Sequence, residues 1–378
     1  MSVRLKGMTW AHPRGYAPMM ATSKAWTVRH PDVTIEWDKR SLQAFGDFPL
    51  EQLAEMYDLL VIDHPHVGIC AQEKTLLPLN QPGREAELAE LAEHALGSCH
   101  ESYFWEGNQW ALAIDAASQV SVWRPDLLPN PPQTWDDVRK LARTGCVLWP
   151  LKPIDAIMSF FSLAAGCGVA CPVPGELVTA DAGEAILKFM ADVAKLLPDI
   201  CLEQSPIDVL ELLSHHDRFS YCPLLFCYSN YARPGFRPHR LVFGDVPKSN
   251  DEKLGLGILG GTGLAISAHC RHREVALDYA YWVAGSECQR TLYFASGGQP
   301  AHLLAWLDPE VNRASHNFFQ TLCPSLHRAW LRPRHAGYLN FQDRAGEVIN
   351  DFLRTGSSAA ATVRELRSAY HESFNVEG

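Results

Sequence analysis

The chain has 378 residues, of which 47% are hydrophobic and 20% are charged, and its formal net charge is −10. This length accommodates two domains or two lobes, each with a sizeable core, and the composition is that of an ordinary globular protein. The acidic balance and the lack of any lysine and arginine cluster argue against a protein that binds nucleic acid.

The sequence shows no membrane-spanning segment and no secretory leader. Its most apolar stretch, residues 160–170, is shorter than the roughly 20 residues that a spanning helix needs. The opening residues MSVRLKGMTWAHPRGY lack an apolar core and a small-residue cleavage site. We therefore expect a periplasmic or extracellular protein if a leader has been removed, and a cytoplasmic one if Met1 is the native start.

The 11 cysteines, an odd number, lie mostly among apolar residues. They form no CxxC motif and no common zinc spacing. This pattern predicts buried thiols in a reducing setting rather than a disulfide framework, and we expect neither a metal site nor a cofactor.

The first 63 residues predict a βαβαβ unit, and hence a doubly wound sheet. Strands are expected at 4–10, 33–38 and 58–63, with helices at 17–30 and 49–57 and a loop over 10–16. Residues 68–80 are expected to run over the surface, before a helix at 87–96 and a hairpin with its turn at 106–108.

The rest of the chain predicts a second α/β unit. Helices are expected at 134–145, capped by Thr134, and at 153–168, 179–197 and 272–296, with a short buried strand at 146–151 and another after residue 219. Residues 254–267 are expected to be extended, and the chain after residue 312 helical.

The stretch GLGILGGTG, residues 255–263, has the letters of a dinucleotide-binding fingerprint. Such a fingerprint needs a strand before it and a helix start after it, whereas here polar, turn-like residues precede it and the strand-like LAIS follows. We therefore interpret the glycines as a crossing between lobes that permits close backbone approach, with Gly260 and Gly261 as candidate ligand contacts.

Several segments, taken in order, resemble the family 1 extracellular solute-binding proteins of ABC transporters, the maltose-binding-protein-like receptors. The most specific are the hairpin motif from Gly107 to Asp115, the Thr-Trp-Asp-Asp helix start at Thr134, and GGTGLAIS with the helix that follows it. The likeness runs from about residue 5 to about residue 355.

The resemblance implies an α/β, bilobed periplasmic-binding-protein-like fold of type II, with two mixed sheets flanked by helices. The N-terminal lobe would comprise 1–112 and about 264–310, and the C-terminal lobe 118–260 and about 320–378. Hinges would lie near 113–117, 261–267 and 300–320. The implied function is non-catalytic: a small polar ligand, such as a sugar or sugar derivative, is bound between two closing lobes and delivered to ABC permease subunits.

The resemblance also implies that ligand groups come from loops at the carboxyl ends of strands, as in open α/β sheets generally. Aromatic faces would stack on sugar C–H faces, and Asp, Arg and His would bond to hydroxyls. In the first lobe the candidates are Trp10, His12, Arg14, Tyr16, Trp37, Asp38, Asp63 and His64. In the crossings and the second lobe they are Asp115, Trp149, Gly260, Gly261, Gln299, Arg332 and Arg334.

Plainer interpretations stay open for several of these residues. Trp149 would otherwise belong to the core, and Arg332 and Arg334 would otherwise form salt bridges between helices. Two other functions also stay open. His64 and His66 after a buried strand could serve a metal-dependent hydrolase, although further ligands would be needed. A cytoplasmic binding protein could also sense its ligand rather than deliver it.

Overall fold

The computed structural model describes residues 2–41, 50–169, 171–173, 175–249 and 255–375. They form two compact units. Unit 1 comprises Met1–Ala117, Gly260–Arg313 and Arg334–Ala336, and unit 2 comprises Ser118–Leu259, Ala314–Pro333 and Gly337–Gly378. The chain thus changes unit near residues 117, 259 and 313, and again around 334–336, a short return that is not among the predicted boundaries. The predicted hinge movements stay predictions.

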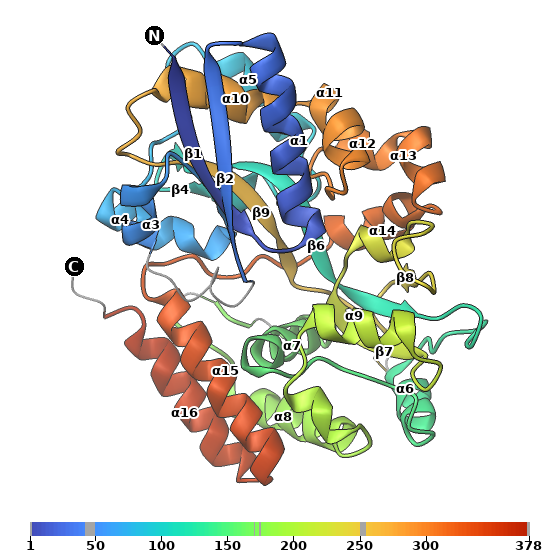
Figure 1. Cartoon of the computed structure of the whole chain (residues 1–378). Coiled ribbons are helices and arrows are strands. Elements are labelled where there is room, and N and C mark those ends of the chain that lie inside the picture. Colours follow the sequence, from blue (N-terminus) through green and yellow to red (C-terminus); the bar gives the residue numbers. More distant parts are fainter. Residues whose placement is uncertain (1, 42–49, 170, 174, 250–254, 376–378) are drawn as a thin grey trace. The chain divides into compact units, whose positions relative to one another are not determined.

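The sheet of unit 1 has the strand order β2–β1–β3–β9. Strand β1 (Val3–Trp10) is parallel to β2 (Val33–Arg40) and to β3 (Leu59–Ile62), and β9 (Leu259–Ile266) is antiparallel to β3. Figure 1 shows β1 and β2 side by side, with helix α1 (Pro13–Arg29) next to them. The predicted βαβαβ unit is confirmed by this order.

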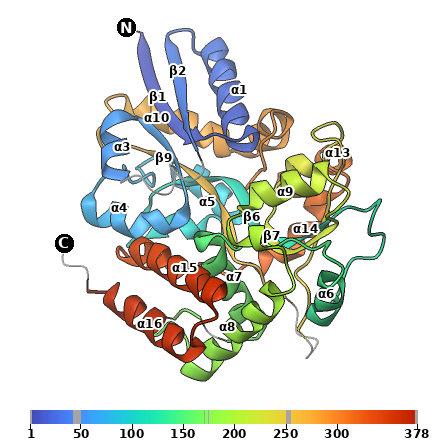
Figure 2. The same cartoon turned by 60° about the horizontal axis from the view of Figure 1, so that its bottom comes forward.

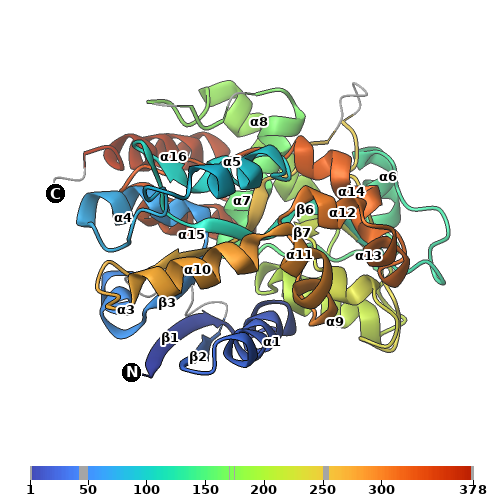
Figure 3. The same cartoon turned by 90° about the horizontal axis from the view of Figure 1, so that it is seen from above.

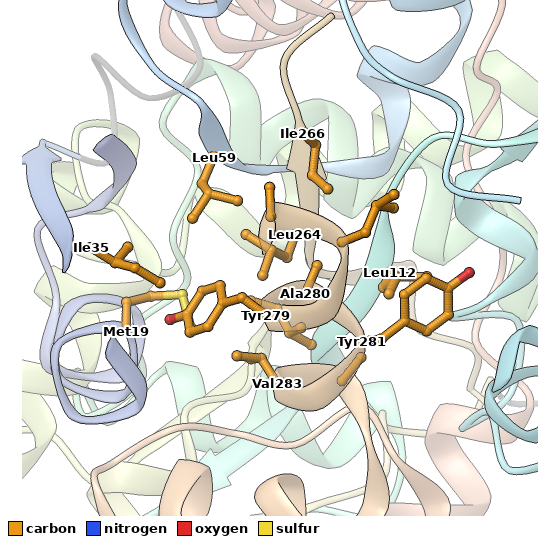
Figure 4. Packing of buried hydrophobic residues seen from close by; sticks show 14 of the residues in the cluster. Met19, Ile35, Leu59, Leu112, Leu264, Ile266, Tyr279, Ala280, Tyr281 and Val283 are labelled. Carbon is orange, nitrogen blue, oxygen red and sulfur yellow. The ribbon is translucent and has the colours of Figure 1, made fainter. Parts of the chain in front are cut away.

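The core of unit 1 lies between its sheet and helices α1 and α10 (Arg273–Ala284). Figure 4 shows Tyr279 of α10 beside Met19 of α1, and Leu264 of β9 near Leu59 of β3. The Tyr279 hydroxyl lies 2.8 Å from Thr22 Oγ1, so the helix-to-helix packing includes a satisfied polar group. Seen from above in Figure 3, α10 and α1 are separate helices of this unit.

The remaining elements of unit 1 surround this core. A two-stranded hairpin is formed by β4 (Phe104–Trp105) and β5 (Asn108–Gln109), and its turn has positive φ at Glu106 and Gly107. The predicted turn at 106–108 is therefore confirmed. The α-helices are α3 (Leu50–Met56), α4 (Val67–Glu73), α5 (Glu85–Glu93), α11 (Ser286–Cys288), α12 (Leu303–Leu307) and α13 (Pro309–Ala314). The 3₁₀ helices are η1 (His64–His66) and η2 (Glu101–Tyr103), and η5 (Gln289–Tyr293) is a short π-helix.

In unit 2, the later part of β6 (Leu112–Trp123) pairs antiparallel with β7 (Tyr221–Phe226) and β8 (Val242–Gly244). Helix α15 (Tyr338–Thr355) packs on α7 (Pro153–Gly166) and on α16 (Ala359–Glu372), and Figure 2 shows α15 and α16 side by side. The other helices are α6 (Trp135–Ala142), α8 (Ala180–Ala194), α9 (Pro206–His215) and α14 (Phe318–His327), with η3 (Asp199–Leu202) and η4 (Ser229–Ala232).

Three local predictions are corrected by the structure. Helix α1 begins at Pro13 rather than residue 17, because His12 caps it and proline suits the first helical position. Residues 68–80 include helix α4, which ends where Lys74 adopts a left-handed conformation. Residues 146–151 form no strand, only a bridge from Val147 to Tyr221, since Pro150 offers no N–H to a ladder.

Thr134 caps α6 as predicted, accepting a hydrogen bond from the Asp137 N–H at 3.2 Å. The glycine-rich stretch is extended, as predicted: it enters β9, and helix α10 starts only at Arg273. In the described part of the chain, every helix is too short or too polar to cross a membrane.

We expect Leu264→Ala to lower the free energy of unfolding by about 2–5 kcal/mol, because the fully buried side chain leaves a cavity in unit 1. Leu307→Ala is the matched control, since Leu307 is 56% exposed, and its effect should stay below about 0.5 kcal/mol. Urea denaturation followed by circular dichroism measures both. Equal losses for the two variants would contradict the assignment of this core.

Candidate functional site

One edge of the unit 1 sheet collects many of the predicted ligand residues. Strands β1, β2 and β3 are parallel, so their carboxyl ends meet at this edge. Strand β9 enters the sheet here, since Gly263 pairs with Ile62, the last residue of β3. We call this edge, with the residues that follow β1 and β3 and those that open β9, the ligand edge.

A buried ion pair between Arg14 and Asp115 lies at the ligand edge. The Arg14 Nε donates to Asp115 Oδ2 at 2.7 Å and its Nη2 donates to Oδ1, so the contact is bidentate. Arg14 is 3% exposed and Asp115 is 2% exposed. Burial raises the pKa of the Asp115 carboxyl, and the Arg14 guanidinium opposes that increase.

The local sequence sets the position of both partners. His12 Nδ1 accepts a hydrogen bond from the Arg14 N–H at 3.0 Å, which holds Arg14 in the first turn of α1. Asp115 lies on β6, where its backbone forms a bridge with Pro300. A residue after β1 and a residue of the first predicted crossing are thereby joined.

Gln299 also belongs to this group of residues. Its Nε2 donates to the Ala116 carbonyl at 2.6 Å, and the Ala116 N–H donates to the Gln299 carbonyl at 3.2 Å. Gln299 is fully buried. The loop after η5 is therefore pinned beside Asp115 by both its side chain and its backbone.

Gly261 provides the close approach between β9 and β6 in unit 1. Its φ is +108°, and a Cβ built there would overlap the backbone carbonyl of Asp115. Any other residue would be strained by this conformation and would displace Asp115. The prediction that glycine permits close backbone approach is confirmed here, whereas a ligand contact of Gly260 or Gly261 stays a prediction.

Asp63 and His64 follow β3 at the ligand edge. Asp63 caps η1, with Oδ1 accepting from the His64 N–H at 2.9 Å and lying 3.2 Å from His64 Nδ1. The His64 side chain is 1% exposed and the Asp63 side chain 30% exposed. Asp63 is therefore a part-exposed carboxylate of this edge, in contact with the buried His64 ring.

Tyr103 contacts residues of the ligand edge, although it is not among the residues predicted from the sequence. Its hydroxyl donates to the Ile62 carbonyl at 3.2 Å, and its ring meets the His64 ring edge-on with centroids 6.3 Å apart. A Cβ at Gly263 would overlap the Tyr103 ring. The sequence feature that could have indicated Tyr103 is its position directly before the β4–β5 hairpin, in the aromatic run Tyr103–Trp105.

Other first-lobe candidates have mainly structural surroundings. The rings of Trp10 and Trp37 lie in the unit 1 core, over Gly15 and Gly7 respectively, and Trp37 Nε1 donates to Ser23 Oγ at 2.6 Å. Their burial follows from the missing side chains of the two glycines, which leave room for an indole.

Asp38 and Tyr16 are engaged near the surface. Asp38 pairs with Lys6 Nζ at 2.9 Å and accepts a hydrogen bond from the Tyr57 hydroxyl at 2.9 Å. The hydrogen bond from Lys6, and to a smaller extent that from Tyr57, lowers the pKa of the Asp38 carboxyl. The Tyr16 ring lies under Lys39 Nζ, 4.7 Å from its centroid. Their ligand roles stay predictions, with no support from these contacts.

Trp149 packs in the core of unit 2, which is the plainer interpretation of this residue. It is fully buried, its Nε1 donates to Ser159 Oγ at 3.0 Å, and its ring lies 5.5 Å from that of Trp135. An aromatic residue at the end of an apolar run can face either the core or a ligand site, and here Trp149 is buried against helix α7.

Arg332 and Arg334 each contact residues of their own unit, and their shared ligand role stays a prediction. Arg332, in unit 2, donates from Nη1 to Gln342 Oε1 at 3.0 Å. Arg334, in unit 1, donates from Nη1 to the carbonyls of Glu101, Ser102 and Phe104 at 2.7, 3.1 and 3.0 Å. Burial lowers the Arg334 pKa. The two arginines belong to different units, because the chain changes unit between them.

His64 and His66 do not gain further metal ligands from the described part of the chain. There, the one group of three or more His, Cys, Asp or Glu side chains with ligating atoms close enough to share an ion is Glu90, His94 and His302. That group includes neither His64 nor His66, so the hydrolase interpretation receives no support.

We expect Gly261→Ala to lower the free energy of unfolding by about 2–4 kcal/mol, because the new Cβ strains the backbone and overlaps Asp115. Gly166→Ala is the control, since a Cβ there meets its neighbours at ordinary distances of 3.6 Å or more. Thermal and urea denaturation of both variants test this. A neutral Gly261→Ala would refute the close approach.

We expect Asp115→Asn to cost about 3–5 kcal/mol, because it leaves the buried Arg14 guanidinium without its counter-charge. The single variants Arg14→Met and Asp115→Leu should be destabilised likewise, and the double variant that combines them should recover much of the loss, since it leaves no unpaired charge. A double-mutant cycle by urea denaturation measures the coupling. Additive effects of the two positions would show that the ion pair is not formed.

No family model and no curated protein sequence matches this chain. Solved structures do match. Maltose-bound MalE3 of T. maritima aligns with a TM-score of 0.83 at 16% identity, covering 99% of this chain and 100% of that one. A solute-binding protein of Thermotoga lettingae, bound with α-D-tagatose, aligns with a TM-score of 0.84 at 14% identity, covering 98% of this chain and 100% of that one.

A third similar structure is an ABC transporter solute-binding protein of Agrobacterium radiobacter K84, in complex with ribitol. It aligns with a TM-score of 0.82 at 15% identity, covering 98% of each chain. By name, these neighbours are binding proteins rather than enzymes. The chain therefore has the α/β periplasmic-binding-protein fold of the MalE-like type II, and the predicted fold class is confirmed.

Proposed function

We propose that this chain is the solute-binding protein of an ABC importer, which binds a small polar ligand of the carbohydrate class without transforming it. The observation that carries this proposal is the whole-chain structural match to proteins bound to maltose, tagatose and ribitol. A polyol or sugar is thus the common chemistry of the neighbours. In the proposal, the two lobes close on the ligand and the closed form docks on the permease.

The ligand edge offers groups suited to sugar hydroxyls. Asp63 presents a part-exposed carboxylate, which accepts hydrogen bonds from hydroxyls more strongly than a neutral group does. Gly260 and Gly261 lie near the start of β9, shortly before Gly263, which pairs with Ile62 at the same edge. The buried Arg14–Asp115 pair and Gln299 support this edge, because Arg14 bonds to Asp115 and Gln299 bonds to the neighbouring Ala116 carbonyl.

The test of this function is a thermal-shift screen against sugars, polyols and sugar acids. We expect one chemical class to raise the melting temperature in a concentration-dependent way, because it binds the folded state. Calorimetry should then give one ligand per chain, and NMR should recover the ligand unchanged. Turnover of the ligand would contradict the binding role, and a screen in which no polar solute binds would contradict the ligand class.

A pair of matched variants locates the ligand. Asp63→Asn should weaken binding by tenfold or more, as expected for the loss of a charged hydrogen-bond acceptor. Asp32→Asn is the control, since Asp32 is exposed and precedes β2 at the other end of that strand. Equal affinities of the two variants would place the ligand away from Asp63.

A further inference from the structure

Three potential metal ligands meet in unit 1, apart from the ligand edge. Glu90 lies on α5 and His94 ends it, so their i, i+4 spacing puts both on one face of the helix. His302, 212 residues beyond Glu90, caps α12. Glu90 Oε1 lies 3.2 Å from His302 Nε2 and 3.5 Å from His94 Nδ1.

These separations suit a shared ion. Zinc–nitrogen and zinc–oxygen bonds are about 2.0–2.1 Å, so two ligands of a tetrahedral zinc lie about 3.3–3.5 Å apart. All three ligating atoms lie within 4.8 Å of one another. The two imidazole rings are stacked, with centroids 5.4 Å apart and 15° between their planes. Small side-chain adjustments would complete the coordination geometry.

The backbone holds the two segments together without an ion. The Leu303 N–H donates to the His94 carbonyl at 2.8 Å, and His302 forms a bridge with Ala95. Because the ligands are carried by paired backbone, little ordering is required for an ion to bind. The site is thus preorganised, unlike an incidental group of surface side chains.

The surroundings also admit a cation. A cavity of about 10 Å³ lined by His94, His100 and His302 lies here, which is about the room one water or ion takes. The Arg290 guanidinium acts electrostatically on His302, and it is already paired with Asp308 at 2.8 Å. Glu90 supplies the negative charge that partly compensates a divalent ion.

We propose that Glu90, His94 and His302 form a binding site for a divalent transition-metal ion, with zinc as the ion that fits best. Two imidazoles and one carboxylate are a typical three-residue zinc set, and water would fill the fourth position. Such an ion joins α5 to the start of α12 and stabilises unit 1. The proposal is independent of the sugar-binding function.

Coordination has two identifiable costs. His94 Nδ1 is hydrogen-bonded to the Glu90 carbonyl at 3.1 Å, and a metal on Nδ1 would replace that bond. His302 Nδ1 accepts a hydrogen bond from the Leu304 N–H at 3.3 Å. When Nε2 binds a metal, a neutral imidazole carries its proton on Nδ1, so this cap is given up. The measured affinity will therefore be lower than three unencumbered ligands would give.

The experiment titrates metal-free protein, prepared with a chelator and kept reduced, with ZnCl₂ by calorimetry, and follows the melting temperature. We expect one equivalent of zinc to bind and to raise the melting temperature, and Mg²⁺ to do neither. Co²⁺ should give the visible absorption of a four-coordinate site. His94→Gln and Glu90→Gln should each weaken zinc binding at least tenfold, and both positions are part-exposed, so folding should persist.

Two controls distinguish this site from others on the chain. Glu211 and His215 have the same spacing and lie 3.4 Å apart, but Glu211 is held by Arg237, and the residues that the structure describes offer them no third ligand. His215→Gln should therefore bind zinc normally. Cys323→Ser removes the thiol next to His327 and should also be silent. Zinc binding that survives His94→Gln, or that is lost in Cys323→Ser, would overturn the proposal, as would no binding at all.

Discussion

The rest of the structure depends on the close approach between the backbone of β6 and the stretch from Gly257 into β9. In unit 2 a Cβ at Gly257 would overlap the Gln119 carbonyl, and in unit 1 a Cβ at Gly261 would overlap that of Asp115. Each unit therefore has its own point at which only glycine fits. The two strands can be close neighbours on their way from one unit to the next because these side chains are missing.

The buried Arg14–Asp115 pair follows from that contact in unit 1. With β6 held against β9, Asp115 faces the first turn of α1, and Arg14 closes on it in a bidentate contact. A buried ion pair adds little net stability, because desolvation offsets the attraction, but it is costly to break. The ion pair fixes positions: it holds the residues after β1 against β6, where Gln299 is also bound.

The segment from Gln299 to His302 connects the two sites proposed for unit 1. Gln299 and Pro300 pair with β6 beside the ligand edge, and His302 pairs with the end of α5. An ion on His302 would stiffen a segment whose other end supports Asp115. A binding protein gains from such stiffness, since support that is ordered beforehand lowers the entropy cost of holding a ligand.

Local periodicity and turn chemistry determined much of this molecule without tertiary information. The βαβαβ start, the hairpin turn at Glu106 and Gly107, the Thr134 cap and the extended glycine stretch were all predictable, because each depends on neighbours within a few residues. The same information indicated that residues after β1 and β3 would share an edge, since parallel strands must end together.

Only the tertiary structure decided which side chains meet there and which turn inward. Trp37 is buried because Gly7 leaves room for its indole, and Trp149 is buried against α7. Arg332 and Arg334 belong to different units, because the chain changes unit between them. Tyr103 reaches Ile62, and His302 reaches Glu90 across 212 residues, through pairings that no local pattern encodes. Sequence spacing limits which residues are neighbours along a helix or strand, whereas a binding site is assembled by contacts between elements far apart in the chain.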